Sequence, residues 1–208
     1  MYQTYEQYDI ACTYFWKSVE LLRSLVEEWP EILSYQTQLS SVIARIAHAK
    51  TLSFPNMMPK EAFGEVVSLY EESLEIRRNV FAKDPTNPDY LHRITIPQFR
   101  LAEVYESVGD DLKAKQFLEE CLDIRKRLVN DYPQNPSFKR FLAQAHENAV
   151  FLMRRLGDEK SSKKYYGECL NLRRGLVRDY PQSVMYRREL ETFINKSKRV
   201  IIKNKGET

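Results

Sequence analysis

The chain has 208 residues, 43% of them hydrophobic and 29% charged, a composition typical of soluble folded proteins rather than disordered ones. No apolar run approaches the roughly 18 residues of a membrane span, and three cysteines without a CxxC pair exclude a disulfide framework and a thiolate zinc site. Residues 1–10 are polar and are not a signal peptide. We therefore expect a reduced, cytoplasmic protein with no membrane partner.

Helical periodicity and turn residues predict eight helices, over residues 4–28, 32–52, 60–83, 89–108, 111–131, 137–156, 159–179 and 184–203. Asn-Pro pairs at 87–88 and 135–136 precede two of these segments, because proline fits the first helical turn. Gly109 and Gly157 are expected to end helices, and Asp110 and Asp158 to cap the helices that follow.

The segments 70–85, 118–133 and 166–181 are copies of one another, and their terminal prolines lie 48 residues apart. A weaker copy ends at Pro30, 55 residues before Pro85, which indicates an insertion at 54–59. Glutamates and arginines recur at matching places in each copy, at Glu72, Glu120, Glu168, Arg77, Arg125 and Arg173. These columns predict ion pairs between stacked units.

Each unit consists of two helices, which we call first-type and second-type in chain order. Residues 1–30 form a half-unit or cap helix, 31–85 unit one, 86–133 unit two, 134–181 unit three, and 182–208 a C-terminal capping helix. A helix pair cannot bury its apolar face alone, so stacking must build the core. The sequence therefore predicts an all-α fold of antiparallel helix pairs in a single repeat domain over residues 1–208.

The repeat resembles the tetratricopeptide repeat in a long-helix form of about 48 residues. Unit two supplies the motif as Leu101, Ala102, Tyr105, Gly109, Asp110, Ala114, Leu118, Cys121, Leu122 and Pro133. Residues 74–78 look like repeats of kinesin light chains, and residues 178–190 like repeat regions of bacterial Ser/Thr kinases. The resemblance implies a right-handed α-solenoid.

The array begins with a second-type helix. Either residues 1–29 are a native cap, or the chain is a piece of a longer protein, which is the interpretation we favour. The first helix is rich in aromatic residues, at Tyr2, Tyr5, Tyr8, Tyr14, Phe15 and Trp16. Self-association through this helix is a further expectation.

No motif points to catalysis, and none of the three histidines stands in a metal-ligand spacing. Cys121 and Cys169 occupy a place where the resembled family needs a small buried residue, so packing is expected of them. Pro97 lies inside a predicted helix, where it indicates a bend or a late helix start. We therefore expect no enzyme, no catalytic residue, no cofactor and no metal.

The resemblance places a binding groove on the concave face, which the first-type helices line. The residues expected there are Arg45, His48, Phe99, Arg100, Glu103, Asn148, Phe151, Arg155 and Lys196. Four of them form a column of hydrogen-bond donors one unit apart, Arg45, Arg100, Asn148 and Lys196, which suits carboxylates or an acidic peptide. The two phenylalanines would supply apolar pockets beside this column.

The sequence thus predicts a non-enzymatic scaffold that binds a protein or peptide segment in its groove. A first alternative is a regulatory or oligomerisation module of a larger signalling protein such as a Ser/Thr kinase. A second is RNA binding through the basic C-terminal half, because residues 1–108 carry a net charge of −5 and residues 109–208 one of +8. Few aromatic residues accompany these basic ones, so nucleic acid is the weaker alternative.

Overall fold

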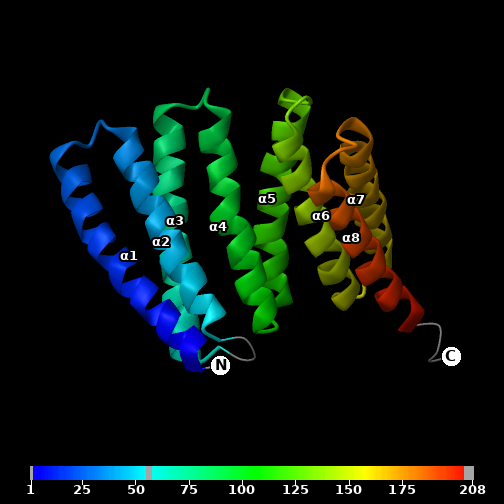
Figure 1. Cartoon of the computed structure of the whole chain (residues 1–208), viewed down its shortest axis with the longest axis horizontal. Coiled ribbons are helices and arrows are strands. Elements are labelled where there is room, and N and C mark those ends of the chain that lie inside the picture. Colours follow the sequence, from blue (N-terminus) through cyan, green and yellow to red (C-terminus); the bar gives the residue numbers. More distant parts are fainter. Residues whose placement is uncertain (1, 55–57, 204–208) are drawn as a thin grey trace. The chain divides into compact units, whose positions relative to one another are not determined.

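The computed structural model describes residues 2–54 and 58–203, and within them every regular element is a helix. The helices of this described part are α1 (Tyr2–Glu28), α2 (Leu33–Leu52), α3 (Lys60–Lys83), α4 (Pro88–Ser107), α5 (Asp111–Asp131), α6 (Pro136–Arg155), α7 (Glu159–Asp179) and α8 (Val184–Lys203) (Figure 1). Each begins and ends within two residues of its predicted bounds. The predicted all-α solenoid class is confirmed.

The chain divides within α5 into two compact units, residues 1–124 and 125–208. In the first unit, α2 packs against both α1 and α3, and α3 packs against α4. In the second unit, α7 packs against both α6 and α8. The helix pairs α2–α3 and α6–α7 each run antiparallel (Figure 1). A single domain over residues 1–208 stays a prediction.

Side chains and glycines define the helix ends as the sequence predicts. Asn87 accepts a hydrogen bond from the backbone N–H of Asp89 at 3.0 Å, and Asn135 accepts one from Ser137 at 2.9 Å. Gly109 and Gly157 adopt φ angles of 81° and 76°, in the left-handed region that glycine enters without steric cost. The carboxylates of Asp110 and Asp158 likewise accept from backbone N–H groups three residues later.

A small polar side chain recurs in the core where second-type and first-type helices cross. The Ser73 hydroxyl donates to the carbonyl of Ser40 at 2.8 Å, and the thiols of Cys121 and Cys169 donate to the carbonyls of Thr95 and Ala143 at 3.5 and 3.2 Å. All three donors are 0% exposed, and burial raises the pKa of the Cys169 thiol to about 11. The two cysteines therefore pack as the sequence predicts, and close approach of the backbones requires their small size.

The arginine column is buried, which the sequence analysis did not foresee. Arg77 and Arg125 are 5% and 3% exposed, and each donates to a backbone carbonyl sixteen residues later, at Arg93 (2.6 Å) and Phe141 (2.5 Å). The predicted ion pairs between units use other arginines, because Arg23 pairs with Glu72 at 2.8 Å and Arg78 with Glu120 at 3.4 Å.

Pro97 lies inside α4, which begins at Pro88, so the structure does not show a late helix start. Proline has no N–H, so the carbonyl of Arg93, four residues earlier, lacks its helical donor. The Arg77 guanidinium donates to that carbonyl instead. The repeated buried arginine thus satisfies the backbone group that Pro97 leaves without a partner.

Two expectations fall partly beyond the described structure. Residues 55–57 of the predicted insertion, and the side chains of Tyr2, Tyr5 and Tyr8, lie outside the described residues. The described part of α1 exposes Ile10, Tyr14 and Leu21. No described helix has the length and apolar character to cross a membrane.

Candidate partner-binding site

Three of the predicted site residues lie together in the first compact unit, residues 1–124. Arg100 and Glu103 form an ion pair at 2.7 Å. Burial and the charge of Arg100 lower the pKa of the half-buried His48, while Glu103 raises it less. His48 is therefore neutral at pH 7 and offers one donor and one acceptor. Arg45 is exposed on the preceding first-type helix.

Phe99 corrects one expectation. Its side chain is only 3% exposed, so it belongs to the core and cannot contact a partner in this conformation. The helical periodicity placed Phe99 on the open face of α4, but other helices cover more of α4 than expected. The residues Gln98, Phe99, Leu101 and Ala102 are all buried.

In the second compact unit (residues 125–208), two pockets are lined by residues of α6, α7 and α8. The one nearer the start of α8 holds about 390 Å³ and is mostly polar. We call it the polar pocket; it is lined by Arg140, Gln144, Glu147, Asn148, Arg173, Arg188, Glu189 and Thr192. The other holds about 210 Å³, and we call it the apolar pocket; it is lined by Val150, Phe151, Arg154, Glu159, Ser162, Lys163, Tyr166 and Ser197.

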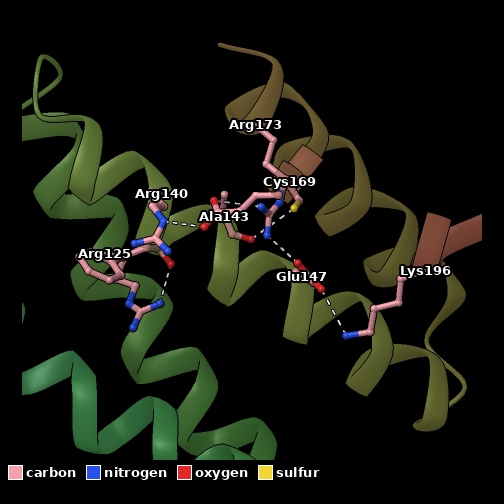
Figure 2. A network of polar contacts seen from close by, with 9 residues as sticks. Arg125, Arg140, Ala143, Glu147, Cys169, Arg173 and Lys196 are labelled. Atoms are coloured by element: carbon pink, nitrogen blue, oxygen red, sulfur yellow. Dashed lines mark hydrogen bonds and ion pairs between the residues drawn. The ribbon is translucent and has the colours of Figure 1, made fainter. Parts of the chain in front are cut away.

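Arg173 organises the floor of the polar pocket. Its side chain is 7% exposed, and its two terminal nitrogens contact Glu147 at 2.6 Å and Glu189 at 3.3 Å. Each carboxylate has a second cation, since Lys196 lies 3.2 Å from Glu147 and Arg140 lies 2.7 Å from Glu189. Figure 2 shows Arg173 and Lys196 on opposite sides of the Glu147 carboxylate.

This network fixes the charge of the polar pocket. Because both carboxylates are already paired, they offer little to a cationic ligand. Arg188 also lines the pocket and has no ion-pair partner among the described residues. Together with the amide of Asn148, it is available to bind an acidic group from outside.

Lys196 joins the two pockets. Its ammonium contacts Glu147 of the polar pocket and lies 4.5 Å from the ring centroid of Phe151, which lines the apolar pocket. This geometry fits a cation–π contact and holds the lysine side chain along α6. Of the predicted residues, Asn148 thus lines the polar pocket, Phe151 lines the apolar pocket, and Lys196 contacts residues of both.

Other predicted residues lie elsewhere. Arg155 is exposed and lines neither pocket. Arg45 and Arg100 lie in the first compact unit and Asn148 and Lys196 in the second, so the column of donors stays a prediction.

The sequence did not reveal several residues that line the two pockets, chiefly the buried Arg173 and Ser197 and the half-buried Glu189 and Tyr166. One signal was available for Arg173, because its column recurs every 48 residues, but the column alone does not show whether an arginine is buried. Glu189 takes the place of Arg93 and Phe141 in the earlier units, and there the arginine meets a carboxylate.

A third pocket of the second compact unit has a volume of about 390 Å³ and is lined by His146, which is 2% exposed. Burial and the charges of Lys126 and Lys164 lower the pKa of His146 to about 4. Its Nδ1 lies 3.3 Å from a carboxylate oxygen of Glu168, and because the ring is neutral this contact is not an ion pair. Within the described residues, no group of three or more His, Cys, Asp or Glu side chains could hold a metal ion.

A family model of the tetratricopeptide repeat matches residues 98–127. No curated protein sequence matches the chain.

Among solved structures, the crystal structure of BtubC (BKLC) from P. vanneervenii is similar over 91% of this chain and 63% of its own, with 21% identity and a TM-score of 0.62. This chain thus spans less than two thirds of the length of that protein. A de novo designed helical repeat protein, DHR64, covers 91% of this chain and 87% of its own at 14% identity and a TM-score of 0.49. The resemblance to the tetratricopeptide repeat is confirmed over residues 98–127, and the chain has a helical-repeat fold. The likeness to kinesin light chains and to kinase repeat regions stays a prediction.

Proposed function

We propose that the chain is a non-enzymatic scaffold that binds an acidic segment of a partner protein along its first-type helices. The observation that carries the proposal is the polar pocket between α6 and α8. There Arg188 and Asn148 are available, while Arg173, Arg140 and Lys196 already neutralise the carboxylates of Glu147 and Glu189. An added carboxylate therefore meets hydrogen-bond donors and little repulsion.

The pair of Arg100 and Glu103, with His48 and Arg45, forms a second candidate surface within the first compact unit. A cytoplasmic location belongs to the same proposal, because the three cysteines are free and two of them are buried. The presence of a tetratricopeptide repeat supports a role in protein binding, since stacked helical repeats create extended binding surfaces.

The test compares Arg188→Glu with Arg187→Glu. Both residues are exposed on α8 and undergo the same change of charge, but only Arg188 lines the polar pocket. Proteins captured by the wild-type chain are identified by mass spectrometry, and binding of each variant to them is then measured by fluorescence polarisation. We expect Arg188→Glu to lose about tenfold or more in affinity, and Arg187→Glu about twofold, because rim charges contribute less. Equal effects of the two variants would refute the pocket as the binding site.

A further inference from the structure

The apolar pocket is lined by a serine of α8, at a place where α2 and α4 carry larger aliphatic residues and α6 carries an alanine. The place held by Ser197 is held by Ile46 in α2, Leu101 in α4 and Ala149 in α6, each 0% exposed. Ser197 is also buried, at 2% exposed. A serine fills less core volume than the isoleucine of α2 or the leucine of α4, and the apolar pocket lies beside it.

The pocket has an unpartnered polar group in its wall. The Ser197 hydroxyl is buried and has no hydrogen-bond partner, although buried hydroxyls normally have one. The remaining walls are largely apolar and come from Val150, Phe151 and Tyr166. A volume of about 210 Å³ is sufficient for one large side chain such as leucine or phenylalanine.

The rim of the pocket is basic. Lys163 lines it without an ion-pair partner in the described part of the chain, and Lys196 lies over Phe151. The rim's carboxylate, Glu159, lies 3.7 Å from Arg154 and is thereby neutralised. An apolar side chain entering the pocket would thus be accompanied most favourably by acidic neighbours.

We propose that the apolar pocket is the anchor site for one large apolar side chain of the partner, in a segment that also carries the carboxylate bound at the polar pocket. This inference rests on the proposed function and adds specificity to it. Lys196 and Glu147 stand between the two pockets, so the partner needs both residue types along one extended segment. Affinity then comes mainly from the buried side chain and orientation from the carboxylate.

The test uses Ser197→Leu, which restores the residue that α4 has at this place and fills the pocket. Phe151→Ala is the second variant, because Phe151 is only half-buried and its loss removes a wall with less effect on the fold. Circular dichroism at 222 nm establishes that each variant is folded. A phage-displayed random peptide library is selected on the wild-type chain, and enriched peptides are synthesised with their large apolar residue intact or replaced by serine.

We expect enriched peptides to combine Asp or Glu with a large apolar residue. Replacing that residue by serine should weaken binding roughly tenfold to a hundredfold, as burial of a large apolar side chain implies, and Ser197→Leu and Phe151→Ala should weaken it similarly. Peptides that lose binding to Arg188→Glu but bind Ser197→Leu and Phe151→Ala as tightly as wild type would overturn the anchor and leave the proposed function standing. Peptides indifferent to all three variants, or no enrichment at all, would overturn both.

Discussion

The exchange Arg173→Met, compared with Arg125→Met, separates two uses of the same repeated arginine. Both side chains are buried, at 6% and 3% exposed. Arg125 donates to the carbonyl of Phe141, which also accepts its ordinary bond within α6. Arg173 instead neutralises two carboxylates that are 15% and 26% exposed. Loss of Arg173 should therefore cost much more.

The magnitude follows from the partners that remain. Removing one member of a buried ion pair typically costs about 3–5 kcal/mol. Here Lys196 and Arg140 still contact Glu147 and Glu189, so we expect a loss of about 2–4 kcal/mol, or roughly 4–16 °C in Tm for a chain of this size. For Arg125→Met we expect a change within about 1 kcal/mol, because relief from burying a charge offsets the lost hydrogen bond.

The assay is urea unfolding followed by circular dichroism at 222 nm, with thermal unfolding as a second measure. Because repeat arrays can unfold unit by unit, midpoints and slopes are compared for each transition. A further exchange of Glu147→Gln in the Arg173→Met background should recover part of the loss, since it removes a carboxylate that has lost its main partner. Equal stability of Arg173→Met and Arg125→Met would refute the distinction between carbonyl and carboxylate partners.

Three further predictions concern stability and reactivity. Because the pKa of His146 is lowered to about 4 from 6.5, the folded state binds fewer protons than the unfolded chain between these values. Stability should therefore fall by up to roughly 3 kcal/mol as the pH drops through that window. The variant His146→Gln, which has the residue found at Gln98 in the preceding unit, should show a weaker dependence of stability on pH. If the urea midpoints of the wild-type chain and the variant fell equally with decreasing pH, the prediction would be wrong. Gly157→Ala should cost about 1–2 kcal/mol because of its φ of 76°, as measured by thermal unfolding, and a cost near zero would show that the turn relaxes. In the native chain a thiol reagent should modify Cys12 faster than the buried Cys121 and Cys169; rapid reaction of all three would show that the core opens.

Local sequence signals are sufficient to predict the helices and their arrangement in pairs. Periodic apolar positions, Asn-Pro starts and Gly-Asp turns act over a few residues, so their effect is visible in the chain, and the caps at Asn87, Gly109 and Asp158 form as expected. The 48-residue period also identified which residues share a place in each unit.

The tertiary structure alone decided how deeply each of these places is buried and what it contacts. Phe99 was expected to line the groove but is in the core. Arg173 was expected to pair with a glutamate of a stacked unit, and the structure shows in addition that it is buried and lines the polar pocket. Sequence phase gives the direction of a side chain on its own helix, whereas burial depends on which neighbouring helices cover that direction. The apolar pocket likewise is lined by residues of α6, α7 and α8, so it depends on how three helices pack and not on Ser197 alone.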